Sequence, residues 1–294
     1  MTRKTARDFA PEVLQLFDQY VHGLLSRRGF VQSAAKYTAG IVAAEALLAE
    51  LSPNFAYAQV PAQDARIQTR DVEIPSPQGY GTVRGYLAQP ADAKGQLPVV
   101  LVVHENRGLN PHIRDVARRL AVEGFVALAP DALHPLGGYP GDEDQARALF
   151  PKLDQTRTRA DFLAAAAWLK ALPQGKGKVG VVGFCYGGGM ANYLATQLPD
   201  LAAAVPFYGA HPPDAEVPRI KAPLLVQLAS DDERINADWP RYEAALKQAG
   251  VRYEAHVYPG TQHGFHNDTT PRFEAGSARL AWQRTVAFFN QHLR

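Results

Sequence analysis

Residues 179–195 read VGVVGFCYGGGMANYLA, and the only cysteine of the 294-residue chain, Cys185, stands in the middle of this stretch. The apolar run that ends at Phe184 is typical of a buried strand, and a helix is predicted to start just beyond Tyr186. Gly183 and Gly187 flank the cysteine at the G-x-nucleophile-x-G spacing of a sharp strand-to-helix turn. Both glycines have a physical reason, because side chains there would collide where strand and helix cross. The stretch therefore predicts a thiol that is raised above a sheet.

The surroundings of this turn favour a reactive thiol over a buried structural cysteine, which is the alternative. The positive end of the helix that follows favours thiolate over thiol. The backbone N–H of Tyr186 is placed to hold an oxyanion. A second oxyanion N–H is predicted from Asn106, in the stretch HENRGLNP (104–111), which follows the most apolar strand. Glu105 is then expected beside the thiol, where a carboxylate can accept its proton or hold it in check.

A nucleophile at such a turn needs a base and an acid that orients the base, and both follow it in the chain. His263 lies in YPGTQHGFHND (258–268), after the last predicted strand, and is expected to accept the thiol proton. Asp232, in SDDER (230–234), is expected to fix the tautomer of His263. Asp231 and Glu233 are the competing carboxylates.

Other histidines give no metal-binding pattern. His266 is close to His263, but without a third ligand at suitable spacing the pair does not predict a metal site. His104 and His256 are expected to satisfy local hydrogen bonds in or beside strands.

The rest of the chain alternates between apolar strand-like runs and helical patterns, which predicts an α/β domain with a mostly parallel sheet. Two opening strands, 67–74 and 80–87, are expected to form an antiparallel hairpin. The later strands are expected at 98–104, 125–130, 178–184, 203–209, 222–229 and 251–259, and a last helix at 277–292. The glycine-rich loop 133–144 is either a border of the pocket or a plain connector.

Composition restricts the class of protein. The net charge of +2 and the mixed signs give no basic stripe for nucleic acid, and 46% hydrophobic residues suit one sizeable core. A single cysteine cannot form an internal disulfide. We expect a small-molecule partner and one large α/β domain over residues 59–294.

Residues 1–58 carry features of an export signal. SRRGFV (26–31) resembles the twin-arginine signature, an Ala/Leu-rich run follows from Thr38 to Leu51, and Ala56 and Ala58 fit a cleavage site before Gln59. This predicts twin-arginine export to the periplasm. The alternative is a cytoplasmic protein that retains a helical appendage, since the apolar residues from Val13 to Leu25 recur at helical spacing and the run is too short and charged for a membrane span.

The motifs GFCYGGG, HENRG, DDERIN and YPGTQHGFHND together resemble the dienelactone hydrolase family, the carboxymethylenebutenolidases of the α/β hydrolase fold. The resemblance covers nearly all of residues 67–293. It implies a triad on Cys185, Asp232 and His263, a gating glutamate on Glu105, and no cofactor. The implied reaction is hydrolytic opening of a lactone through an acyl-thioester enzyme.

One position departs from the family. An arginine that binds the substrate carboxylate is expected four residues beyond the histidine, where this chain has Asn267. A second such arginine corresponds to Arg147. The alternatives are a general carboxylesterase or thioesterase without lactone preference, and a non-catalytic binding protein on a hydrolase fold.

Overall fold

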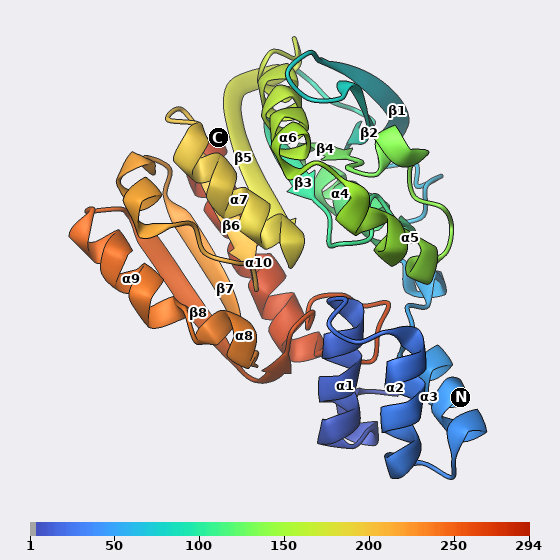
Figure 1. Cartoon of the computed structure of the whole chain (residues 1–294). Helices are drawn as coiled ribbons and strands as arrows, with labels where there is room; N and C mark the ends of the chain where they lie inside the picture. The colour runs from blue at the N-terminus through green and yellow to red at the C-terminus, as the bar shows by residue number, and fades with distance from the viewer. Residues whose placement is uncertain (1–3) are drawn as a thin grey trace.

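The computed structural model describes residues 4–294, so residues 1–3 of the predicted N-terminal segment lie outside it. Within the described residues the central feature is one eight-stranded sheet with helices on both faces (Figure 1). The strand order is β1-β2-β4-β3-β5-β6-β7-β8. The strands are β1 (Ile67–Ser76), β2 (Gly81–Pro90), β3 (Leu97–Val103), β4 (Val126–Pro130), β5 (Gly175–Phe184), β6 (Ala203–Phe207), β7 (Leu224–Asp231) and β8 (Tyr253–Gln262).

The pairing of the strands confirms the predicted α/β class with a mostly parallel sheet. β1 and β2 form the antiparallel hairpin, β2 also pairs antiparallel with β4, and all later pairs are parallel. The five residues from Val99 to Val103 are completely buried, because helices cover both faces of β3. In a parallel sheet the carboxyl ends of strands meet at one edge, so the loops after β3, β5, β7 and β8 are neighbours.

Helices on the two faces of the sheet bury two separate apolar clusters. One cluster takes Phe162 from α6, Leu194 from α7 and Leu246 from α9. The other takes Leu120 from α4 and Phe289 from α10. The helices of this domain are α4 (Pro111–Val122), α5 (Glu143–Leu149), α6 (Gln155–Lys170), α7 (Tyr186–Gln197), α8 (Glu233–Asn236), α9 (Trp239–Gln248) and α10 (Ala275–Leu293).

The N-terminal segment forms a small helical unit of its own, at the end of the molecule near α5 and the start of α10 (Figure 1). Its helices are α1 (Pro11–Val21), α2 (Arg27–Ala34) and α3 (Ile41–Leu51). Ser26 caps α2 by accepting a 3.0 Å hydrogen bond from the N–H of Gly29. The rings of Phe17, Tyr20 and Phe30 pack together in a third apolar cluster.

Polar contacts dock this helical unit on the α/β domain of residues 59–294. Arg272 donates a 3.2 Å hydrogen bond to Asp18 of α1, and Arg27 forms a 2.8 Å ion pair with Asp144. The side-chain amide of Asn106 donates a 2.9 Å hydrogen bond to the carbonyl of Val21, the last residue of α1. None of the helices in residues 4–294 is long and apolar enough to cross a membrane.

Candidate active site

Cys185 lies at the tip of the turn between β5 and α7, in a strained backbone conformation. Its φ of 56° and ψ of −113° are unusual for a residue with a side chain. A Cβ atom on Gly183 would overlap the carbonyl oxygen of Gly187, and a Cβ on Gly187 would overlap the carbonyl oxygen of Val103. The close crossing of strand and helix therefore requires glycine at both positions, as the sequence pattern indicates.

The histidine and the carboxylate expected to serve the thiol come together at the carboxyl ends of β7 and β8. His263 directly follows β8, and its Nδ1 lies 2.5 Å from Oδ2 of Asp232, with both side chains buried. Asp231 is exposed and accepts a hydrogen bond from Ser230 instead, and Glu233 is exposed as well. Among the three candidate carboxylates, Asp232 is the one in contact with the imidazole.

The electrostatics of the pair favour a thiolate facing an imidazolium. Burial by itself would raise the pKa of Cys185, but the charge of His263 and a hydrogen bond with His22 lower it from 9.0 to about 5. Burial would lower the pKa of His263, yet the charge of Cys185 and the hydrogen bond with Asp232 raise it from 6.5 to about 10. Near neutral pH the sulfur is therefore a ready nucleophile.

Glu105 and Asn106 follow β3 and border the thiol pocket. Oε2 of Glu105 accepts a 2.8 Å hydrogen bond from Nδ2 of Asn267, the residue that stands where the family places an arginine. The side chain of Asn106 donates to the carbonyl of Val21 at 2.9 Å, which ties the loop after β3 to the end of α1. The backbone N–H groups of Asn106 and of Tyr186, the first residue of α7, remain the predicted oxyanion donors.

Arg147 lies against the N-terminal helical unit. Its guanidinium stacks over the ring of Tyr20 at 4.1 Å and donates to the carbonyl of the same residue at 3.4 Å. The arginines that border the thiol pocket itself are Arg107 and Arg272. The loop 133–144 reaches the pocket through Glu143 and Asp144, so it borders the pocket and is more than a connector.

The sequence did not single out His22, which directly follows α1 and contacts the thiol. Its Nε2 lies 3.5 Å from Sγ of Cys185, and its Nδ1 lies 3.3 Å from Oδ2 of Asp18. Nη2 of Arg234 also lies 3.0 Å from Nε2 of His22. Burial would lower the pKa of His22, but the hydrogen bonds with Asp18 and Cys185 raise it. No local signal could have found this contact, because 163 residues separate the two side chains.

The docked helical unit leaves little room at the thiol. The cavity that Cys185 and His263 border has a volume of about 50 Å³ and is also bordered by Phe17 and Tyr20 of α1. Pockets for small ligands usually measure about 300–1,000 Å³. The arrangement in which α1 covers the thiol therefore admits a few waters or a very small group.

Three other histidines, His104, His256 and His266, have other contacts. Nδ1 of His104 lies 2.5 Å from the carbonyl of Glu105, and its Nε2 accepts from the N–H of Ala132 at 3.1 Å. The ring of His266 is buried and stacks on Phe184. His256, on β8, lies 3.9 Å from Glu254.

A cysteine on a strained strand-to-helix turn, beside a histidine that a carboxylate orients, defines a hydrolase of the α/β type that acts on esters or lactones. Comparison with known proteins supports this class. A family model described as "Dienelactone hydrolase family" matches residues 83–293, and a second one, "YqhI-like", matches residues 1–36. The chain belongs to the dienelactone hydrolase family.

Similar proteins agree with this assignment. A "Putative carboxymethylenebutenolidase" of Synechocystis is 35% identical over 230 residues, which are 72% of this chain and 93% of the relative. A "Putative hydrolase fragment YghX" of Escherichia coli is 54% identical over 112 residues, 38% of this chain and 96% of the relative. The crystal structure of a "Putative Dienelactone Hydrolase" from Klebsiella pneumoniae is 31% identical, has a TM-score of 0.70 and covers 76% of this chain and 99% of its own.

Proposed function

We propose that the protein is a cysteine-dependent hydrolase that opens a lactone or a small carboxylic ester through an acyl-thioester intermediate. The observation that carries this proposal is the chain of contacts from Asp232 to His263 and on to the sulfur of Cys185. The carboxylate and the imidazole lie 2.5 Å apart, and the free nitrogen of the imidazole and the sulfur lie within 4.8 Å.

In the proposed reaction the thiolate of Cys185 attacks the carbonyl carbon of the substrate. The N–H groups of Asn106 and Tyr186 stabilise the oxyanion that forms. The imidazolium of His263 gives its proton to the departing oxygen, so the C–O bond breaks and a thioester remains. A water molecule then attacks the thioester, passes a proton to His263, and the sulfur leaves as thiolate. The carboxylate of Asp232 holds the imidazole in place throughout.

Substitution of the nucleophile gives the direct test. Cys185→Ala should abolish turnover of aryl esters and lactones, and mass spectrometry of the unaltered protein during turnover should detect an added acyl group. Loss of that added mass in the variant identifies the sulfur as its carrier. Unchanged turnover by Cys185→Ala would contradict the proposal.

A general carboxylesterase or thioesterase without lactone preference is the second candidate, and Asn267 favours it. The amide carries no charge with which to bind a substrate carboxylate, and its N–H already donates to Glu105. Arg107 and Arg272 border the same pocket and support the first candidate, because either guanidinium can bind a carboxylate. Comparing kcat/KM for dienelactone and for uncharged short-chain esters separates the two candidates.

For residues 1–58 two proposals stand. Export to the periplasm through the twin-arginine pathway is a prediction from SRRGFV and from the small residues before Gln59. Retention is supported by the contact of Asp18 with Arg272 and by that of Arg27 with Asp144. Mass spectrometry of the protein isolated from its native host decides, since a mature chain that starts at Gln59 means export.

A further inference from the structure

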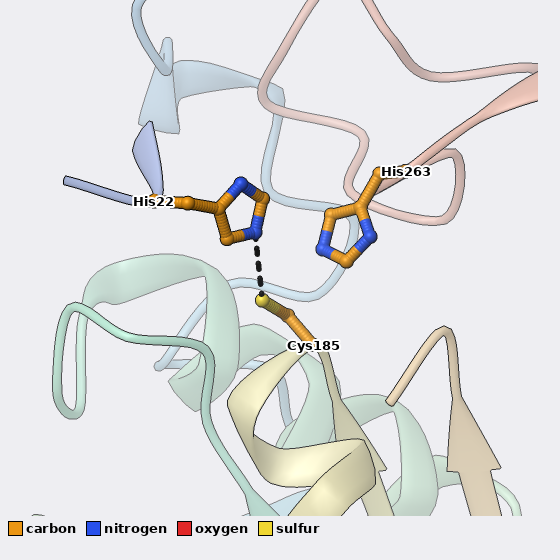
Figure 2. Close-up of side chains that lie close together, drawn as sticks. All are labelled: His22, Cys185 and His263. Atoms are coloured by element: carbon orange, nitrogen blue, oxygen red, sulfur yellow. Dashed lines mark hydrogen bonds between the residues drawn. The ribbon is translucent and has the colours of Figure 1, made fainter. Parts of the chain in front are cut away.

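Three side chains from distant parts of the chain converge at the thiol. Figure 2 shows His22, Cys185 and His263 pointing toward one centre, with a dashed line between His22 and the sulfur. Nε2 of each histidine and Sγ of the cysteine lie within 4.8 Å of one another. His263 is only 5% exposed, and among the described residues its Nε2 has no hydrogen-bond partner. The centre therefore holds one sulfur and two ring nitrogens in close proximity.

The opposite nitrogen of each histidine is held by oxygen. Nδ1 of His22 lies 2.8 Å from the backbone carbonyl oxygen of Asp18 and 3.3 Å from Oδ2 of the same residue, and Nδ1 of His263 lies 2.5 Å from Oδ2 of Asp232. Metal binding displaces the Nε2 proton of each imidazolium, and the hydrogen bond on Nδ1 then leaves the lone pair of Nε2 directed at the centre. Histidines that bind metals almost always have such an outer partner, which orients the ring and raises its basicity.

The distance between two of the three donors suits a tetrahedral ion, and the widest donor separation, up to 4.8 Å, must shorten when the ion binds. Zinc binds cysteine sulfur at about 2.3 Å and histidine nitrogen at about 2.0–2.1 Å, so adjacent donors are about 3.3–3.6 Å apart. Sγ of Cys185 and Nε2 of His22 are 3.5 Å apart. The cavity of about 50 Å³ on the open side accommodates a water as fourth ligand.

We propose that His22, Cys185 and His263 form a binding site for zinc or a similar divalent transition metal, and that metal binding blocks the nucleophile. Two nitrogens and one sulfur are donors that suit such ions, whereas calcium and magnesium prefer oxygen donors. The binding site stands on the geometry alone, whereas the inhibitory effect rests on the proposed hydrolase function. The bound ion also links α1 to the thiol pocket, since one of its ligands comes from the N-terminal helical unit.

One neighbouring cation must move when the metal binds. Nη2 of Arg234 lies 3.0 Å from Nε2 of His22 in the same region. The side chain of Arg234 is exposed, so it can turn into solvent. The carboxylates of Asp18, Asp232 and Glu105 lie around the centre and compensate the charge of the ion.

Binding is tested first, without any assay of hydrolysis. The metal-free full-length protein is titrated with Zn²⁺ in competition with a chromophoric chelator, and with Co²⁺ to record a thiolate-to-cobalt absorption band. We expect one equivalent of either metal. His22→Gln should weaken Zn²⁺ binding by more than about tenfold. Asp18→Asn should weaken it by less, because the backbone carbonyl of residue 18 keeps its contact with Nδ1 of His22. His256→Gln, on the strand that leads to His263, is the matched control and should bind as the unaltered protein does.

Hydrolysis is measured separately on the same proteins. Zn²⁺ should inhibit the unaltered enzyme, and His22→Gln should need a correspondingly higher concentration for the same inhibition. No metal binding, or equal affinity in His22→Gln and the unaltered protein, would overturn the proposed site. Metal binding without hydrolysis in any form of the protein would instead contradict the proposed function and leave the site in place.

Discussion

Nδ2 of Asn267 donates a 2.8 Å hydrogen bond to Oε2 of Glu105, so the amide that stands where the family pattern predicts an arginine contacts the carboxylate that the same pattern predicts as the gate. The carboxylate is thereby held by a neutral partner at the rim of the pocket. In the proposed mechanism, proton transfer at the sulfur therefore belongs to His263, which is the imidazole in contact with Asp232.

Glu105 should consequently contribute less to catalysis than His263. We expect Glu105→Gln to lower kcat/KM for an aryl ester less than about tenfold, because the amide keeps the contact with Asn267. His263→Gln should lower it by about 10²–10⁴-fold, the usual contribution of a general acid and base. Steady-state kinetics of the two variants side by side make the comparison. Equal losses would assign the proton transfer to the carboxylate.

The ionisation of the single thiol can be measured directly, because Cys185 is the only cysteine. Alkylation by iodoacetamide requires the thiolate. The folded-state pKa of about 5 lies below the ordinary 9.0, so the rate in the native protein should rise through pH 5 and be level by about pH 7. In urea-unfolded protein the rate should rise near pH 9. A native profile that also rises near pH 9 would mean that the two histidines do not stabilise the thiolate.

Loosening the N-terminal helical unit should enlarge the range of accepted substrates. Asp144 forms an ion pair with Arg27 and accepts a hydrogen bond from the hydroxyl of Tyr20. We expect Asp144→Ala to raise kcat/KM for bulky aryl esters relative to aryl acetates by up to about tenfold, which corresponds to about 1.4 kcal/mol. Asp200→Ala, which removes the surface ion pair with Lys170, is the control. The same ratio in both variants would show that α1 does not limit access.

The buried carboxylate of Asp115 should be important for stability. It is completely buried and accepts hydrogen bonds from Arg119, from the N–H of Gln59 and, at 2.8 Å, from the N–H of Val60. We expect Asp115→Ala to lower the free energy of unfolding by about 3–5 kcal/mol, because Arg119 loses one of its two buried anionic partners and the N–H groups of Gln59 and Val60 lose their acceptor. Urea unfolding followed by circular dichroism measures the loss.

The control for that prediction is a surface ion pair between β1 and the same helix, α4. Asp71 lies 3.0 Å from Arg114, and its side chain is 66% exposed. Asp71→Ala should therefore cost less than about 1 kcal/mol. Similar losses in the two variants would mean that the buried network around α4 contributes no more than a surface ion pair does.

The sequence predicted those features of the fold that depend on local patterns. The apolar runs predicted the inner strands β3, β4 and β6 within a few residues, since a strand covered on both faces must be apolar throughout. The glycines beside Cys185 predicted the sharp turn, because only the absent Cβ permits the crossing of β5 and α7. The order of Cys185, Asp232 and His263 followed from the family pattern, and the structure brings these three side chains together.

The position of the N-terminal residues could not be predicted in the same way. The apolar spacing from Val13 onward predicted a helix, and α1 covers Pro11–Val21. Nothing in that spacing indicates which surface the helix contacts, because the contacts of His22 and Asp18 involve residues far along the chain. The contact of Asn267 with Glu105 could not be predicted either, because it depends on the relative positions of two loops that are far apart in the sequence.

The ion pair of Asp18 with Arg272 joins positions 254 residues apart. During synthesis the first helices leave the ribosome long before the loop that carries Arg272 exists. They therefore cannot dock on that loop until almost the whole chain has been synthesised. Contacts with such separation form late, because the chain loses more freedom when it closes a long loop. Where the N-terminal helical unit is retained, we therefore expect its docking over the sulfur to be one of the last steps of folding.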